Sequence, residues 1–217
     1  MKKYVAAIIL CVGLFFGLIV LASSSRNLRL PDNQQGYAPP QPISFSHRRH
    51  AGELQIHCRF CHTGADKSRH AGIPSSDVCM KCHRLVTAAI ADIQNENTLA
   101  KNEKRNPRPI ISPELRKLYD SLGLGDDLKP ADGKRPKSIA WKRVHDLPDY
   151  VYFDHRAHVT AGVKCQTCHG PVESMERMRQ HSTLSMGWCV NCHRRSNRHG
   201  IEGRAVHASN DCATCHH

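Results

Sequence analysis

"CRFCH", residues 58–62, is the stretch that decides the fold of this 217-residue chain. Two thiols and an imidazole within five residues suit a redox dithiol, two zinc ligands next to a histidine that does not bind the metal, or the attachment point of a haem. The same pattern returns as CMKCH (79–83), CQTCH (165–169), CVNCH (189–193) and CATCH (212–216). These five stretches are called motifs 1 to 5 in chain order. Since a histidine follows the second cysteine in every copy, one chemistry must explain all five.

Haem attachment is the chemistry that uses all three residues of the motif. A short C-x-x-C turn spaces two thiols for the vinyl groups on one edge of a haem, and the adjacent histidine binds the iron. A zinc site usually pairs two C-x-x-C hairpins and a redox dithiol needs no histidine at a fixed place. The sequence therefore predicts five covalently bound haem c groups. The attachment residues are Cys58, Cys61, Cys79, Cys82, Cys165, Cys168, Cys189, Cys192, Cys212 and Cys215, and the proximal iron ligands are His62, His83, His169, His193 and His216.

Composition points to an interior that side chains alone do not fill. Aromatic residues are only 6%, whereas the chain has 11 Cys and 16 His. We therefore expect a mostly irregular fold with short α-helices around a haem-filled core. The formal net charge is +12, but five haems bring about ten propionate charges that would offset it within the fold. No nucleic-acid partner is predicted.

The N-terminus predicts a membrane segment. "MKK" precedes 19 uncharged residues, 4–22, whose length suits a membrane-spanning helix. A cleaved signal peptide and an uncleaved anchor both fit, and the length favours the anchor. We expect one transmembrane helix within an anchor of residues 1–25, in the bacterial cytoplasmic membrane. Lys2 and Lys3 would then lie in the cytoplasm, with the haem modules on the periplasmic face.

A repeat precedes two of the motifs. FSHRRH (45–50) precedes motif 1 and FDHRAH (153–158) precedes motif 3, and a further histidine follows before the next motif. This predicts a dihaem module over 40–95 and a trihaem module over 147–217. Between them, 96–146 is expected to be a linker. Its stretch SPELRKLYDSLGL (112–124) has a Ser cap, a Pro in the first turn and a Gly stop, which predict one short helix.

The F-x-H-x-x-H stretch ahead of C-x-x-C-H resembles the class III small multihaem cytochromes c. The resemblance implies that His47 is the second ligand of haem 1, His155 of haem 3 and His158 of haem 5. Spacing extends the assignment to His70 for haem 2 and His181 for haem 4. His50 occupies the position in its repeat that matches His158, but the dihaem module has no third haem for it. It is therefore expected to reach a haem of the other module. The remaining histidines are interpreted as surface residues or partners of ligands: His57, His145, His199, His207 and His217.

A closer resemblance covers most of the chain after the apolar segment. The five haems divided two and three, with "HAGIPS", "WKRVHDLPDYVYFDHRAH", "CHGPVESM" and "LSMGWCVNCHR", resemble the pentahaem cytochrome subunit of alternative complex III. That family implies iron–sulfur and integral membrane subunits of a quinol-oxidising complex as partners. It also implies a monohaem cytochrome or soluble acceptor.

If every iron has two protein ligands, no coordination position is left for a substrate, and the expected function is electron transfer from a quinol-oxidising complex to a periplasmic acceptor. The chain is then an electron-transfer subunit and not an enzyme by itself. The alternatives are a stand-alone quinol dehydrogenase, a periplasmic electron shuttle, or a multihaem reductase. A reductase would need an exposed iron without its second ligand.

Overall fold

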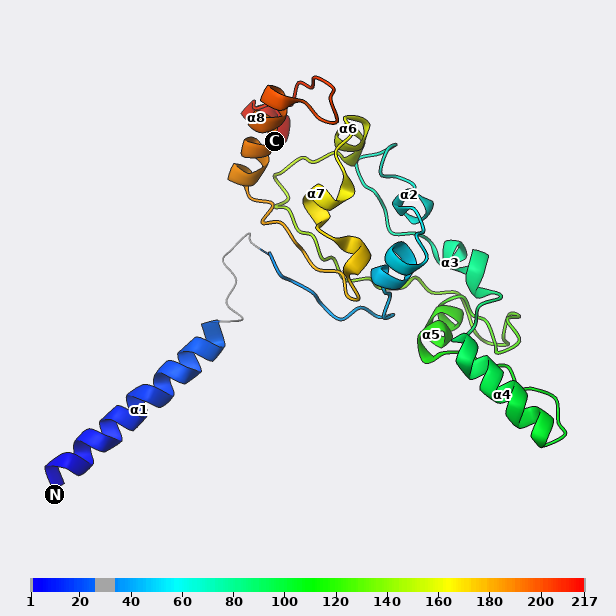
Figure 1. Ribbon diagram of the computed structural model, residues 1–217. Helices are drawn as coiled ribbons and strands as arrows, with labels where there is room; N and C mark the ends of the chain where they lie inside the picture. The colour runs from blue at the N-terminus through cyan, green and yellow to red at the C-terminus, as the bar shows by residue number, and fades with distance from the viewer. Residues whose placement is uncertain (1, 26–33, 217) are drawn as a thin grey trace.

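The computed structural model describes residues 2–25 and 34–216. These residues form short helices joined by irregular segments (Figure 1). The β structure among the described residues consists of isolated β-bridges. The elements are α1 (Lys2–Ser25), η1 (Arg48–Glu53), α2 (Cys58–Cys61), α3 (Ser76–His83), α4 (Ile90–Asn102), α5 (Pro113–Ser121), α6 (His155–Thr160), α7 (Cys165–His169), η2 (Val172–Ser174), α8 (Met186–His199) and α9 (Cys212–Cys215). The mostly irregular, helical fold expected from the sequence is confirmed. Met1 and His217 lie outside the described residues.

The predicted membrane span is corrected by the structure. A crossing needs about 20 consecutive apolar residues, and no helix in the described part of the chain has both the length and the apolar character for it. The transmembrane helix expected within 1–25 is therefore wrong. The location derived from it, a bacterial cytoplasmic membrane with the haem modules on the periplasmic face, is wrong as well.

Local sequence explains where the short helices begin. The side chains of His57, Ser185 and Asp211 accept hydrogen bonds from backbone N–H groups in the first turns of α2, α8 and α9. Such caps satisfy N–H groups that have no partner within the helix. Because each cap lies shortly before a motif, it positions the helical turn that carries the two thiols.

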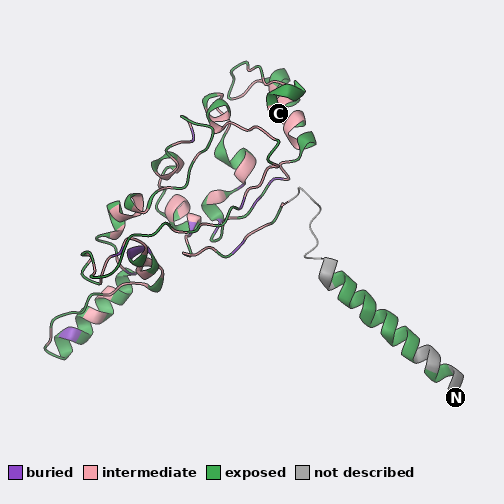
Figure 2. Ribbon diagram, turned by 180° about the vertical axis from the view of Figure 1, so that it is seen from behind, coloured by how far each residue is buried: buried purple, intermediate pink, exposed green. Residues whose placement is uncertain are grey.

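Few apolar side chains are buried. In the described residues the buried hydrophobic side chains are Ala65, Ala88, Ala100, Leu118, Tyr119, Val144 and Met175. Figure 2 shows the same scarcity, with most of the ribbon exposed or intermediate. A domain of this size normally buries a much larger apolar core. The polypeptide therefore does not fill its own interior, as the composition predicts.

The predicted linker helix is confirmed as α5. Ser112 caps it, with its hydroxyl accepting from the N–H of Leu115, and Pro113 opens the first turn. Leu118 and Tyr119 are buried, and the Tyr119 hydroxyl donates to the carbonyl oxygen of His83 in motif 2. The helix α5 thus packs against the segment that carries motif 2. Beyond it, α4 extends away from the rest of the body (Figure 1).

The two predicted modules are in direct contact. The N–H of Arg48 in η1 donates to the carbonyl oxygen of Met175 at 2.9 Å, and its guanidinium pairs with Glu176 at 2.9 Å. Gly52 lies so close to the carbonyl oxygen of Glu173 in η2 that a Cβ atom there would clash with it. Only glycine permits this approach of the two backbones. The first repeat is therefore packed on the segment that follows motif 3.

Candidate haem sites

Every motif lies on a helical turn. The helices α2, α3, α7, α8 and α9 each carry one C-x-x-C pair. Residues three apart lie on the same face of a helix, so the two sulfurs of each pair point to one side. No disulfide joins the cysteines of the described residues, and no group of three or more His, Cys, Asp or Glu side chains among those residues could hold a bare metal ion. The cysteines are not gathered as in a tetrahedral zinc site.

The first repeat supplies one imidazole to each of the first two motifs. The rings of His47 and His62 have centroids 6.5 Å apart and planes 8° apart. The rings of His50 and His83 have centroids 6.1 Å apart. The structure thus pairs His50 with motif 2, in the place expected for His70, and not with the other module.

The second repeat does the same for motifs 3 and 4. The rings of His155 and His169 have centroids 6.3 Å apart and planes 7° apart. The rings of His158 and His193 have centroids 6.1 Å apart. The structure therefore brings His158 to motif 4, whereas the sequence assigned it to motif 5 and gave motif 4 to His181.

The phenylalanine of each repeat holds both histidines. Phe45 contacts His47 edge-on with centroids 4.9 Å apart and stacks on His50 at 4.3 Å. Phe153 lies 4.8 Å from His155 and 4.5 Å from His158, measured between centroids. One aromatic ring therefore sets the directions of two imidazoles, which explains why F-x-H-x-x-H recurs as a unit.

The four pairs fit two axial ligands of one haem iron. An imidazole nitrogen binds a metal at about 2 Å, so two rings on opposite sides of one iron have centroids about 6 Å apart. The observed distances are 6.1 to 6.5 Å. The small apolar core leaves room for the macrocycles.

The buried Nδ1 of His47 has no hydrogen-bond partner, and burial, followed by the neighbouring His62 and His50, lowers the pKa of His47 to about 4. It is therefore neutral near pH 7, as a metal ligand must be.

Hydrogen bonds orient most of these rings for metal binding. When one ring nitrogen donates to a carbonyl oxygen, the other is left free for the metal. In six of the eight paired histidines Nδ1 lies 2.6 to 2.9 Å from a backbone carbonyl oxygen, which leaves Nε2 for the iron. The pairs are His50 with Ser46, His62 with Gly72, His83 with Val86, His155 with Arg69, His158 with Asp154 and His193 with Ser209.

His169 of motif 3 has an imidazole partner instead. Its Nδ1 lies 3.1 Å from Nε2 of His145, and the two rings meet edge to face. Burial is the main cause that lowers the pKa of His169 to about 3 and of His145 to about 4, with neighbouring histidines adding to it. Sequence reasoning left His145 among the surface residues or partners of ligands. Its distance from motif 3 along the chain gave no signal of this contact.

Electrostatic interactions between thiols place motif 1 near motifs 2 and 3. Burial and then the Cys82 thiol raise the pKa of Cys61, which places motifs 1 and 2 together. Burial raises the pKa of Cys165, and the next causes are the charge of Cys58 and a hydrogen bond with its thiol. Motif 1 is therefore a direct neighbour of motif 3, in agreement with the contact between η1 and η2.

The other motifs continue the series. Burial and then Cys192 of motif 4 raise the pKa of Cys168 in motif 3 to about 11. Burial and then Cys215 of motif 5 raise the pKa of Cys189 in motif 4. The five motifs thus follow one another in space in the order 2, 1, 3, 4, 5.

Motif 5 is held by the segment before the second repeat. The N–H of Tyr152 donates to the carbonyl oxygen of Cys215 at 2.7 Å, and Val151 forms an antiparallel bridge with His216. The ring of Tyr150, which is largely exposed, lies 5.8 Å from that of His216 between centroids. Motif 5 therefore differs from the other four in the aromatic group beside its histidine.

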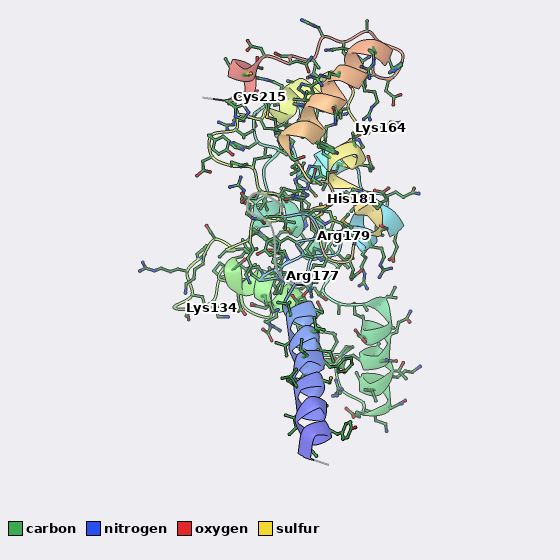
Figure 3. The ribbon with its side chains drawn as sticks, turned by 90° about the vertical axis from the view of Figure 1, so that its left-hand side faces the viewer. Lys134, Lys164, Arg177, Arg179, His181 and Cys215 are labelled. Carbon is green, nitrogen blue, oxygen red and sulfur yellow. The ribbon has the colours of Figure 1, made fainter. Side chains whose placement is uncertain are left out.

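The remaining histidines differ from the paired ones in exposure. All eight paired histidines are half-buried, as are His145 and His216, whereas five others are exposed: His57, His70, His181, His199 and His207. His57 caps α2, and His181 lies against Gly170 at the end of α7. Lys134 lies on the α5 side of the molecule, well below Lys164, which precedes α7 (Figure 3).

Comparison with known proteins finds a similarity to cytochromes c. Residues 151–217 match the family described as cytochrome c7 and related cytochrome c. The chain is 24% identical over 196 residues to a protein of Nitratidesulfovibrio vulgaris named "Menaquinone reductase, multiheme cytochrome c subunit", with 81% of this chain and 76% of the relative covered. The chain is thus similar to multihaem cytochromes c, proteins whose haem c is covalently bound, and the family match covers its C-terminal part.

Proposed function

We propose that the chain is a pentahaem c-type cytochrome and the electron-transfer subunit of a quinone-reactive complex. The observation that carries the proposal is the contact between motifs 1 and 3. Without this contact, motifs 1 and 2 would form one group and motifs 3 to 5 a separate one. With it, the five motifs form one series whose ends are motifs 2 and 5.

Bound haem supplies iron that changes its charge by one electron without a bond being made or broken in a substrate. The thiols would anchor each group. The paired imidazoles would both hold the iron at motifs 1 to 4, so that these residues, and not a substrate, would be its ligands there. The carbonyl oxygens that accept from Nδ1 fix the ring orientations, so little rearrangement accompanies a change of charge.

The relative suggests the kind of partner. Its name assigns it to a menaquinone reductase as a multihaem cytochrome subunit. That name supports a quinone-reactive complex as the partner, whereas the direction of electron flow that we propose follows the resemblance to alternative complex III. On that resemblance, the chain receives electrons from quinol through an iron–sulfur subunit and quinone-binding subunits. It would pass them to a monohaem cytochrome or another soluble acceptor. Motifs 2 and 5, at the two ends of the series, are the proposed points of entry and exit.

The test begins with the whole chain isolated from its native source in mild detergent. We expect five haems per chain by the pyridine haemochrome assay, low-spin signals by electron paramagnetic resonance, and co-isolation with an iron–sulfur protein. Carbon monoxide binding at several ferrous haems would contradict electron transfer as the function and favour a reductase. Isolation with five haems but no partner would favour a stand-alone quinol dehydrogenase or shuttle.

A further inference from the structure

The proximal histidine of motif 3 has a hydrogen-bond partner of a different chemical kind. At motifs 1, 2 and 4, Nδ1 of the motif histidine faces a backbone carbonyl oxygen. At motif 3, Nδ1 of His169 faces Nε2 of His145 at 3.1 Å. Since His169 would bind iron through Nε2, its proton is on Nδ1. His169 is then the donor, and Nε2 of His145 is the acceptor.

His145 is held in place by the segment around it. The side-chain amide of Gln41 pairs with the backbone of Lys142 in both directions, at 2.9 and 3.0 Å. The N–H of Asp146 donates to the buried Gln180 side chain at 3.2 Å, and Gln34 donates to the Asp146 carboxylate at 2.9 Å. Hydrogen bonds therefore hold the residues on both sides of 143–145, Lys142 and Asp146. The position of the His145 imidazole beside His169 depends on these contacts.

The acceptor determines how much electron density the proximal ligand gives to the iron. An imidazole nitrogen is a stronger base than an amide carbonyl oxygen, so it draws the Nδ1 proton of His169 further and makes that ring a more basic ligand. A more basic ligand favours ferric iron, and hydrogen bonds of this kind to a metal ligand tune the metal.

We propose that His145 is a positioning residue that sets the potential of the haem at motif 3 below the value that a carbonyl partner would give. The inference rests on one part of the proposed function, which is that motif 3 carries a haem. Motif 3 occupies the middle of the series 2, 1, 3, 4, 5. A lowered potential there places a barrier between motifs 1 and 4, so His145 would control electron exchange between the two halves.

The test uses the full chain loaded with haem and a spectroelectrochemical redox titration. His145→Phe removes the acceptor, His145→Gln keeps one, and His199→Phe replaces an exposed histidine as a control. We expect His145→Phe to shift one haem to higher potential, His145→Gln to recover most of the shift, and His199→Phe to change nothing. A second substitution, His155→Met, changes the opposite ligand of the same iron and so identifies which titration step belongs to motif 3.

Three outcomes would overturn the inference: unchanged potentials in His145→Phe with normal haem content, equal shifts in His145→Phe and His145→Gln, or a shift in another haem. If His145→Phe does not load fully, His145→Asn replaces it, since its shorter amide does not reach His169. Failure of the proposed function would be visible separately, as missing haem in the unmodified chain or as isolation without a redox partner.

Discussion

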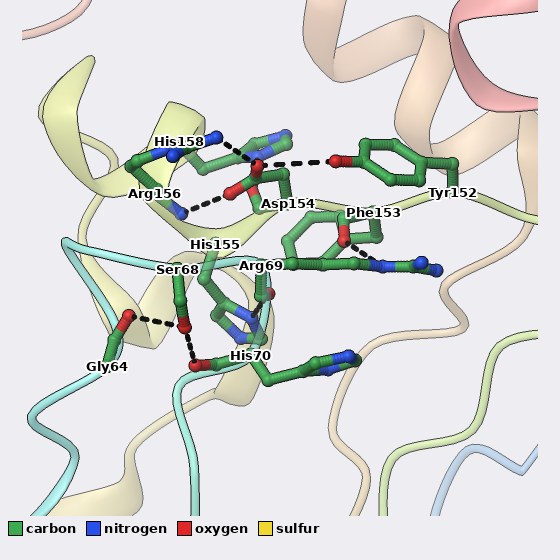
Figure 4. A network of polar contacts seen from close by, with 10 residues as sticks. All are labelled: Gly64, Ser68, Arg69, His70, Tyr152, Phe153, Asp154, His155, Arg156 and His158. Carbon is green, nitrogen blue, oxygen red and sulfur yellow. Dashed lines mark hydrogen bonds and ion pairs between the residues drawn. The ribbon is translucent and has the colours of Figure 1, made fainter.

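The carbonyl oxygen of Arg69 lies 2.9 Å from Nδ1 of His155 and also accepts the backbone N–H of His155 at 3.1 Å (Figure 4). Arg69 comes from the segment between motifs 1 and 2, whereas His155 faces His169 of motif 3. A residue of the first predicted module therefore orients a candidate ligand of the second.

Arg69→Ala is expected to loosen His155. The Arg69 guanidinium donates to the carbonyl oxygen of Phe153 at 3.2 Å and lies 4.4 Å from the centroid of the Tyr152 ring. Losing both contacts should cost about 1–2 kcal/mol of unfolding free energy. It should also broaden the paramagnetic resonance signal of one haem. Arg59→Ala, which removes an ion pair with Asp66 within the first module, is the control. Equal broadening in both variants would refute the dependence.

His50→Phe tests the pairing at motif 2. Because the ring of His50 faces His83, its removal should leave one iron with an open position, and the ferrous protein should bind about one more equivalent of carbon monoxide. The comparison is His70→Phe, which replaces the exposed histidine that spacing assigned to the same haem. Carbon monoxide binding in His70→Phe but not in His50→Phe would restore the assignment from spacing.

Gly52→Ala tests the contact between η1 and η2. Since an added Cβ would meet the backbone of Glu173, the two elements must separate, which should cost about 1–3 kcal/mol. The melting temperature should fall by about 2–4 °C for each kcal/mol. Gly187→Ala is the matched control, because nothing lies within 4 Å of its added Cβ. A Gly52→Ala chain as stable as the control would show that the contact is not close in solution.

Tyr119→Phe should destabilise the packing of α5 on α3. The substitution removes the hydroxyl that donates to the carbonyl oxygen of His83, while the buried ring remains. The expected loss is about 1 kcal/mol, measured by denaturant unfolding. Tyr150→Phe alters an exposed tyrosine and should have a smaller effect. If the two variants unfold alike, the linker does not support motif 2 through this bond.

Acid should open the segment around α4. Hydrogen bonds with the Arg105 side chain, then with the Arg108 N–H, lower the pKa of Glu96 to about 2. A carboxyl group whose pKa is lowered by folding stabilises the fold above its unfolded pKa of about 4.3, and this contribution is lost as pH falls toward 2. Protection of the backbone amides in 90–110, measured as the exchange rate relative to the intrinsic rate at each pH, should therefore decrease over this range. In Glu96→Gln the protection should be weaker at neutral pH and should change less with pH; an unchanged protection profile would contradict the role of the ion pair.

Local features were predictable from the sequence. The motifs lie on helical turns, and α5 begins at Pro113 after its Ser112 cap, because caps and i, i+3 spacing depend only on adjacent residues. The internal repeat was also recognisable, and both copies use one phenylalanine to hold two histidines. What repeats in sequence here also repeats in geometry.

Partners across long distances were not predictable. Spacing assigned His70 and His181 to motifs 2 and 4, whereas the structure faces those motifs with His50 and His158. In each repeat the two histidines are three residues apart and face different motifs. Which motif each one faces depends on how η1 and α6 pack in the fold, and spacing along the chain does not reveal this. The contact of His145 with His169 depends on the same packing and has no sequence signature.

The scarcity of buried apolar side chains has a consequence for how the cell makes this protein. A chain that has not yet received its haem groups has few buried apolar contacts to stabilise its fold, and its backbone would be accessible to proteases. Only molecules that complete attachment would accumulate. The yield of the protein is therefore itself a measure of maturation, and a weakened attachment site should appear first as a low abundance of the protein.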